Sequence, residues 1–462
     1  MVQNNGKGTV AFSMKKEFFA AMNSYGGFVS HYKTSFAQER RYIIKGGPGC
    51  GKSTLMRRIA AEAERRGCDV EYYDCSSDPD SLDGIVLPSL GIALFDGTAP
   101  HEEAASAPGW RDNLIDLGAF WDTELLRTHQ NEIIVLSEHK SAAYHNAYRY
   151  LGMAGTAALL RLELLGECID TDALSAAAAR LTCKATAGYT RAAKSHEAAT
   201  DRKAPLEKTA SKKAVSVKTK AANSKAKAGN GSISREISTQ SCVEVSGCAS
   251  VCCESIISPQ VTVGALGMCG YVYRPTLEQD ADEIIALRDC HGAAALLLEE
   301  VSRRLCACGI PHTAGLDAPS GDVCVIRAGS VAITLREDIA RARGVRMQSC
   351  RKLLRTDSRT GRAFAELDSA MELFTELAKN RLAEAKTAHF ELERIYGEVM
   401  DYTAADRLCN DLISRLLPPA RKTARRSAQT TSQDHSAKAT SKSTSNAEQK
   451  PTRRKQSEKT KN

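Results

Sequence analysis

The sequence predicts an α/β protein in which helices flank a parallel β-sheet, with a degenerate second copy of the same unit later in the chain. Three observations support this class. An apolar segment at 42–44 runs into a glycine-rich loop and an amphipathic helix, and another apolar segment follows at 68–73. This strand–loop–helix–strand order is typical of parallel sheets covered by helices. A weaker version of the order recurs after residue 265.

The residues that precede the glycine-rich loop favour helices. We predict one helix over 15–23 and another over 27–36, because Phe28, Tyr32 and Phe36 recur at roughly helical spacing in the second segment. Both helices are expected to pack beside the first strand.

The glycine-rich loop fits the pattern G-x-x-x-x-G-K-[ST] at every specified position, between a strand and a helix as that motif requires. Glycines allow backbone conformations that turn successive N–H groups toward one concavity, where phosphate oxygens bind. The predicted nucleotide-binding residues are Gly46, Gly47, Pro48, Gly49, Cys50, Gly51, Lys52, Ser53 and Thr54.

Two side chains of this loop have predicted chemical roles. Lys52 would place its ammonium group on the β- and γ-phosphates, and Ser53 would offer its hydroxyl group to Mg²⁺. The N-terminus of the helix that begins near Lys52 adds free N–H groups and the positive end of the helix dipole. The sequence therefore predicts ATP and Mg²⁺ as ligands.

The segment after the loop predicts the acidic partner of Mg²⁺. A helix with one apolar face ends at Arg66–Gly67, a strand covers 68–73, and short apolar runs follow at 85–87 and 92–95. Asp96 ends the last run, which is the position of a magnesium-holding acid in phosphate-loop proteins. Lys52 and Asp96 are therefore the predicted catalytic residues, and Ser53 and Asp96 the predicted metal ligands.

The residue that activates water is left open by the sequence. Gly97 follows Asp96, so no carboxylate stands directly after the magnesium acid. Asp74, Asp78, Asp83 and His101 are equal candidates, because all lie in polar segments next to predicted strand ends, where open parallel sheets bind ligands.

The rest of the chain divides into a helical extension, a linker, a second unit and a tail. Helices are predicted over 114–126, 131–153 and 154–182. The predicted boundaries are a first domain over 1–183, a disordered linker over 184–241, a second domain over 242–417 and a disordered tail over 418–462. Both disordered segments are rich in Lys, Ala, Ser and Thr and poor in large apolar residues.

The second unit lacks the phosphate-binding chemistry of the first. The segment that begins at Gly270 resembles the one that begins at Gly27, and residues 285–287 correspond to the strand before the glycine-rich loop. Counting back from Gly309, which matches Gly67, puts Ala294 at the position of Lys52 and Ala295 at that of Ser53. Leu335 stands at the position of Asp96. This copy is therefore not expected to bind a magnesium nucleotide.

The runs GGPGCGKSTLMRRI and CSSDPDSLDGIVLPSLGIALFDGTAPH resemble the uncharacterised bacterial tandem P-loop ATPases, whose two halves each carry a phosphate loop. The likeness is specific over 25–150 and loose over 265–415. It implies a P-loop NTPase fold, with ATP and Mg²⁺ at residues 46–54 and Asp96. The chain departs from the family pattern by losing the second loop and gaining long basic segments.

Charge and cysteine content restrict the partners. Residues 184–235 carry 13 Lys or Arg against 3 acids and residues 419–462 carry 12 against 3, which leaves 38 basic and 49 acidic residues elsewhere. The basic segments are suited to weak, nonspecific binding of nucleic acid or anionic surfaces, or to solvation alone. No membrane span or signal peptide is predicted, so a cytoplasmic location is expected. Scattered cysteines without paired spacing indicate free thiols rather than a zinc site.

Three functions are compatible with these features. The first is a Mg-dependent ATPase that switches the two halves against each other. The second is a nucleotide-sensing scaffold that barely hydrolyses ATP, which the missing carboxylate after Asp96 favours. The third is a small-molecule or nucleotide kinase, which would need an arginine-rich lid that 68–130 does not show.

Overall fold

The computed structural model describes residues 15–100, 102–201 and 259–419. The described residues all belong to one compact unit that ends at Pro419. The chain therefore packs both predicted domains together. Residues 420–462 of the predicted tail and most of the predicted linker lie outside the described residues, although α5 (Thr171–Asp201) extends as a helix into the segment predicted as disordered from residue 184.

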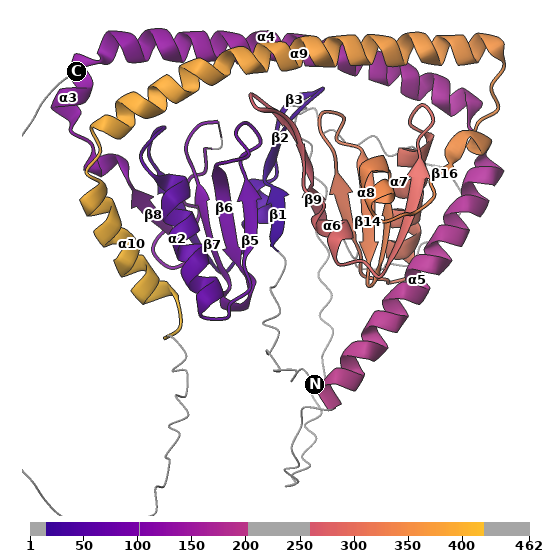
Figure 1. Ribbon diagram of the computed structural model, residues 1–462, viewed down its shortest axis with the longest axis horizontal. Helices are drawn as coiled ribbons and strands as arrows, with labels where there is room; N and C mark the ends of the chain where they lie inside the picture. Colours follow the sequence, from indigo (N-terminus) through magenta and orange to yellow (C-terminus); the bar gives the residue numbers. More distant parts are fainter. Residues whose placement is uncertain (1–14, 101, 202–258, 420–462) are drawn as a thin grey trace, which may run out of the picture. The chain divides into compact units, whose positions relative to one another are not determined.

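The first half, residues 15–128, contains short strands around one helix that follows the glycine-rich loop (Figure 1). Its elements are β1 (Lys16–Phe19), β2 (Ala21–Ser24), β3 (Gly27–Ser30), α1 (Tyr32–Ser35), β4 (Arg40–Lys45), α2 (Lys52–Arg65), β5 (Glu71–Asp74), β6 (Leu82–Leu87), η1 (Pro88–Leu90), β7 (Ile92–Asp96), β8 (Asp112–Asp116), η2 (Gly118–Phe120) and α3 (Thr123–Thr128).

The second half, residues 259–355, repeats nearly the same order of elements. They are β9 (Gln260–Thr262), β10 (Gly264–Gly267), β11 (Gly270–Tyr273), α6 (Thr276–Gln279), β12 (Glu283–Arg288), α7 (Ala293–Ala307), β13 (Thr313–Leu316), β14 (Val323–Ala328), β15 (Val331–Thr334), α8 (Glu337–Ala342), β16 (Gln348–Ser349) and η3 (Cys350–Leu353).

One sheet joins the two halves. Its order within the described residues is β16-β12-β15-β14-β13-β9-β1-β5-β6-β7-β4-β8, and the halves meet where Phe19 of β1 pairs with Thr262 of β9 in antiparallel fashion. Read outward from this junction, each half shows the same succession of strands. A register irregularity also falls at the same place in both, at Tyr73/Asp74 and at Gly315/Leu316.

The predicted parallel sheet is wrong, because the sheet is mixed. β6 is antiparallel to both β5 and β7, and β14 is likewise antiparallel to its neighbours. The physical reason is the length of the connections: η1 and Gly91 alone join β6 to β7, and a parallel crossover needs a dozen or more residues.

The two helices predicted at the start of the chain are also wrong. Residues 15–23 form β1 and the start of β2, and residues 27–36 form β3 and the single turn of α1. Helical spacing of aromatic residues was misleading here. β1 pairs with β5, and β2 turns back on β3 through Tyr25 and Gly26, so sheet pairing overrides local helix preference.

Two other boundaries differ from the prediction. The expected helix over 114–126 is β8, η2 and the beginning of α3, because β8 pairs in parallel with β4. The strand expected over 68–73 is β5, which begins at Glu71 and includes Asp74. By contrast, the predicted apolar face of α2 is confirmed, since Leu55, Met56, Ile59, Ala60 and Ala63 are all buried.

Four helices are exchanged between the halves. α4 (Gln130–Cys168) starts beside the first half, and α5 after it packs on α7 of the second half. α9 (Ser358–Glu398) starts beside the second half, and α10 (Tyr402–Leu416) after it packs on α2 of the first half. α4 and α9 lie side by side along both halves (Figure 1).

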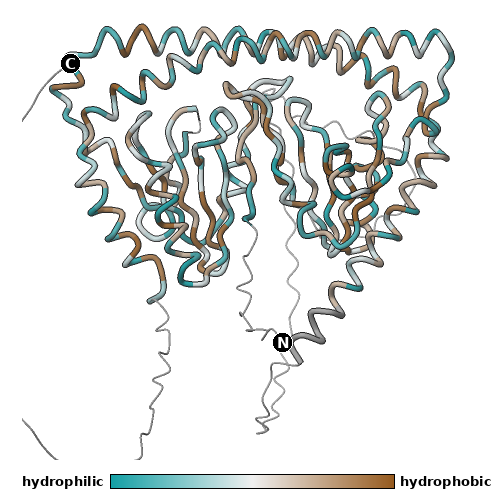
Figure 2. Tube along the Cα trace, in the orientation of Figure 1, coloured by the Kyte–Doolittle hydropathy of each residue, from teal (hydrophilic) through white to brown (hydrophobic). Residues whose placement is uncertain are grey.

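Hydrophobic residues concentrate along the strands and recur at intervals along the helices (Figure 2). One buried cluster combines α4, α5 and α9 with the second half, and another combines α2 with β4, β6, β7 and α10. The exchanged helices are thus part of both cores. Among the described residues, no helix has the length and apolar content needed to cross a bilayer.

Candidate functional site

The glycine-rich loop joins β4 to α2 in the geometry that the sequence predicts. Gly46, Gly49 and Gly51 have φ angles of +153°, +70° and +85°, which side chains with a Cβ rarely adopt. Gly47 has an ordinary φ, but a Cβ there would lie 3.1 Å from the ring of Trp121. Pro48 is half-buried, and burial raises the pKa of the Cys50 thiol within the same loop.

The amine of Lys52 lies inside this loop. Its Nζ donates hydrogen bonds of 2.7 Å to the carbonyl oxygens of Gly46 and Gly47, and it lies 3.5 Å from Oδ2 of Asp96. The predicted lysine and the predicted acid are therefore brought together, although they come from α2 and from the end of β7. A phosphate at this position would compete with these two carbonyl oxygens for the ammonium group.

Ser53 and Asp96 occupy the neighbouring positions. Oγ of Ser53 accepts a 3.1 Å hydrogen bond from the backbone N–H of Leu82, and Oδ1 of Asp96 accepts one of 2.8 Å from the N–H of Thr98. Thr54 is exposed on the first turn of α2. One hydroxyl and one carboxylate suit Mg²⁺, which keeps several waters and binds nucleotide phosphates. Among the described residues, no cluster of three or more acidic, His or Cys side chains offers an independent metal site.

Asp83 lies beside Asp96 on the adjacent strand. Gly84 of β6 pairs with Phe95 of β7, so the next position along places the two acids opposite each other. Burial, and then the charge of Asp96, raise the pKa of Asp83 to about 8, against hydrogen bonds with Cys75 and Tyr32 that lower it. A raised pKa favours the protonated form of Asp83, which lets two carboxyl groups lie side by side.

The other candidates for water activation are placed differently. Asp74 is buried, and Nε of Arg274, from the second half, donates a 2.7 Å hydrogen bond to it. Burial raises the pKa of Asp74 to about 6 although Arg274 lowers it. Asp78 is half-buried and accepts a hydrogen bond from the thiol of Cys269. His101 lies outside the described residues.

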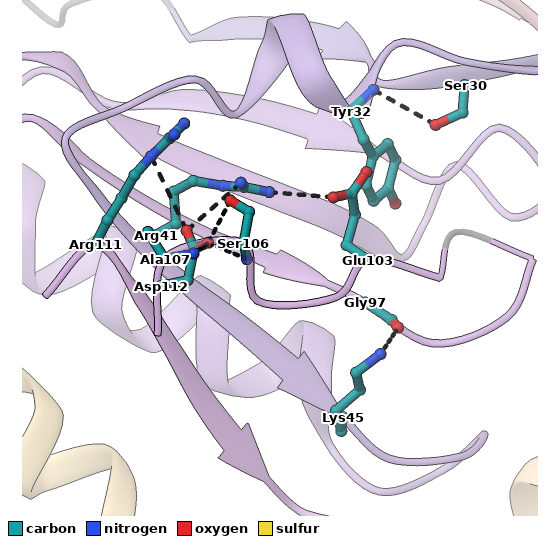
Figure 3. A network of polar contacts seen from close by, with 10 residues as sticks. All are labelled: Ser30, Tyr32, Arg41, Lys45, Gly97, Glu103, Ser106, Ala107, Arg111 and Asp112. Atoms are coloured by element: carbon teal, nitrogen blue, oxygen red, sulfur yellow. Dashed lines mark hydrogen bonds and ion pairs between the residues drawn. The ribbon is translucent and has the colours of Figure 1, made fainter. Parts of the chain in front are cut away.

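A charged network fastens the segment that follows Asp96. The guanidinium group of Arg41 on β4 lies 3.4 Å from Glu103 and 3.5 Å from Asp112, and Asp112 also accepts hydrogen bonds from Ser106 and from the N–H of Ala107 (Figure 3). Burial opposes ionisation of Asp112, but these hydrogen bonds and Arg41 hold its pKa below the ordinary value.

The sequence analysis missed the residues that the exchanged helices bring to this loop. His389 and Glu393 of α9 lie 3.5 Å apart, and burial lowers the pKa of His389 to about 4, with added repulsion from Lys140 of α4 and from Lys52. Burial also lowers the pKa of Lys140, while Glu393 raises it. The spacing of His389 and Glu393, one helical turn apart, marks a shared face of α9 but does not show what that face contacts.

Three aromatic residues line the outside of the loop. The rings of Trp121 and Tyr396 have centroids 5.1 Å apart and both approach Gly47. The hydroxyl group of Tyr402, at the start of α10, donates a 2.8 Å hydrogen bond to the carbonyl oxygen of Gly49. We call Trp121, Tyr396 and Tyr402 the aromatic rim.

In the corresponding loop of the second half, a carboxylate of the loop itself accepts hydrogen bonds from the N–H groups at the helix N-terminus, and we call this loop closed. Asp289 accepts hydrogen bonds of 2.8 Å from the N–H groups of Gly292 and Ala294, at the N-terminus of α7. Gly51 and Gly292 cap α2 and α7 in the same left-handed conformation. Aligned on these caps, the counterpart of Lys52 is Ala293 rather than Ala294, because α7 is one residue longer than α2.

The comparisons with known proteins add no relative. No protein-family model, no curated protein and no solved structure matches this chain.

Proposed function

We propose that this chain binds ATP with Mg²⁺ at residues 46–54 and Asp96, as a P-loop NTPase, and that it hydrolyses the β–γ phosphoanhydride. The observation that carries the proposal is the position of Lys52. Its amine lies within a loop of positive-φ glycines, 3.5 Å from an acid at the end of the adjacent strand, directly at a helix N-terminus. An ammonium group and free N–H groups around one concavity are the requirements for binding a polyphosphate.

Each residue of the site has a separate role in this proposal. The loop N–H groups and Lys52 would hold the β- and γ-phosphates, and Lys52 would exchange its hydrogen bonds to Gly46 and Gly47 for bonds to phosphate oxygens. Ser53 and Asp96 would hold Mg²⁺, which when bound neutralises charge on the phosphates. Asp83, beside Asp96, is the acid best placed to accept a proton from water once it is ionised.

We further propose that the two halves derive from a duplication, and that nucleotide binding alters how they contact each other. The matching strand order and matching register irregularities support the first statement. The contacts of α9 and α10 with the glycine-rich loop support the second, because these helices connect the loop to the second half.

A nucleotide sensor with little hydrolysis is the second candidate. The observation in its favour is the surroundings of the acids: Asp83 is buried beside Asp96, which raises its pKa, Asp74 is paired with Arg274, and Gly97 follows Asp96. Burial of Asp83 and pairing of Asp74 both make these acids less available as bases toward water.

Phosphate release from ATP by the wild-type chain and by Lys52→Ala tests the proposal. We expect Lys52→Ala to lower turnover by at least about 100-fold, because it removes a preorganised positive charge from the transferring group. Lys33→Ala, on the exposed side of α1, is the matched control and should keep wild-type turnover.

Turnover that does not depend on Lys52 would refute the ATPase. Binding of ATP that needs Lys52 but yields no phosphate would instead select the sensor.

A further inference from the structure

We propose that the aromatic rim binds the base of the nucleotide by stacking, so that the ligand is a purine nucleoside triphosphate. This inference rests on the proposed function and adds the part of the ligand that the glycine-rich loop does not contact. Aromatic faces bind nucleobases without reading their edges, and a purine offers the larger face.

The rim is in contact with the phosphate-binding residues. A Cβ on Gly47 would lie 3.1 Å from the Trp121 ring and 3.8 Å from that of Tyr396, and Tyr402 is hydrogen-bonded to Gly49. Tyr402 nevertheless has 48% of its surface exposed. An exposed phenol ring against the loop is available to a ligand that the loop holds.

The sheet order sets the direction in which the ligand extends. β4 lies between β7, which ends in Asp96, and β8, which leads to Trp121. Mg²⁺ binds the β- and γ-phosphates, so Asp96 marks the terminal phosphate side of the loop. The nucleoside end must leave toward the opposite side, which is the side of β8 and the rim.

Two chain connections build the rim together. The N–H of Asp122 donates to the carbonyl oxygen of Val399, and the N–H of Asp401 donates to that of Phe120. Trp121 and Met400 form the bridge between these hydrogen bonds. The rim is therefore held by backbone pairing, which fixes Trp121 beside the first turn of α10.

The second half supplies an internal control for this assignment. There the N–H of Arg355 donates to the carbonyl oxygen of Cys168, and the N–H of Asp170 donates to that of Leu353. Ile169 and Leu354 form the β-bridge between these hydrogen bonds. This repeated pairing aligns Trp121 with Leu354, Tyr396 with Leu165, and Tyr402 with Thr171. All three aromatic residues are thus absent from the half whose loop is closed by Asp289, although the backbone pairing is kept.

The test compares two ligands, ATP and inorganic tripolyphosphate, by calorimetric titration of the full chain. Trp121→Leu and Tyr396→Leu copy the second half. We expect each to weaken ATP binding by about tenfold and to leave tripolyphosphate binding unchanged, since the loss of stacking affects the base alone. Trp110→Leu, at a residue with 76% of its surface exposed, is the matched control and should bind both ligands as wild type does.

Fluorescence gives a second measurement that does not depend on altering the rim. The chain contains two tryptophans, so Trp110→Phe leaves Trp121 as the reporter. ATP should change its emission by more than tripolyphosphate does.

If Trp121→Leu loses the same affinity for ATP as for tripolyphosphate, base stacking on the aromatic rim is refuted. The same holds if ATP does not alter the emission of Trp121. Neither result contradicts the phosphate site. If the wild-type chain binds neither ATP nor tripolyphosphate, the proposed function is refuted, and so is base binding by the aromatic rim.

Discussion

The loops before α2 and α7 differ in the charged side chain that lies at the helix N-terminus. Both follow a strand that pairs in parallel with its neighbours, and both end in a left-handed glycine at a helix N-terminus. In the first half the amine of Lys52 donates to the carbonyl oxygens of Gly46 and Gly47, whereas in the second half Asp289 accepts from the N–H groups of Gly292 and Ala294. An N-terminus that receives an internal anion has no need of a ligand.

This contrast shows that architecture and chemistry are encoded separately. The buried strands keep their order in both halves because the cores on which they pack are apolar throughout. The difference in chemistry follows from a few positions: Lys52 against Ala293, Asp96 against Leu335, and Trp121 against Leu354. The same arrangement of elements can therefore carry different side-chain chemistry.

The largest expected effect tests how tightly α9 closes on the first loop. A Cβ on Gly49 would overlap the backbone carbonyl oxygen of Glu393 at φ +70°, whereas one on Gly292 would meet only the flexible side chains of Leu165 and Arg161, at 3.4 and 3.5 Å, at φ +93°. We expect Gly49→Ala to lower the free energy of unfolding by about 3 kcal/mol and Gly292→Ala by about 1 kcal/mol. Urea denaturation measures both. Equal losses would mean that the two loops are covered alike.

The next effect concerns pH. His389 lies near Lys140 and Lys52, whereas His291 of the second loop lies 2.6 Å from Asp368. Because the folded pKa of His389 is about 4, below its ordinary value, its contribution to stability is present above about pH 6.5 and is lost as the pH falls toward 4. His389→Gln should therefore flatten the stability profile between these values by roughly 2 kcal/mol.

Denaturation at a series of pH values checks this expectation. His145→Gln, at an exposed position on α4, is the control and should keep the wild-type profile. A wild-type profile in His389→Gln would show that burial against α4 and the loop does not keep this ring neutral.

The smallest effect concerns the closed loop. Asp289→Ala removes the acceptor for two N–H groups of α7, and should lower the free energy of unfolding by about 1 kcal/mol. Asp357→Ala, which removes the N-cap of α9, should cost a similar amount. No second equivalent of tripolyphosphate should bind to Asp289→Ala, because Ala293 and Ala294 supply no cation. If calorimetry shows a second equivalent of bound tripolyphosphate, the Asp289 carboxylate alone prevents the second loop from binding phosphate.

Local patterns predicted the glycine-rich loop, the apolar face of α2 and the strand that ends at Asp96, because each depends on residues close together in the sequence. Residues 15–23 and 27–36 were mispredicted as helices, since their conformation depends on pairing with β5 and on a two-residue turn. The antiparallel strands were missed although the short connection at η1 contained the signal. No local pattern shows that His389, Tyr396 and Tyr402 reach the loop.

The exchange of helices also imposes an order on the synthesis of the site. Gly49 and Tyr402 are hydrogen-bonded across 353 residues of chain. At translation rates of about 5–20 residues per second, roughly 20–70 s separate the appearance of the two residues at the ribosome. During that interval the nascent first half has its glycine-rich loop but lacks α9 and α10, so the site becomes complete only when the second half has been made.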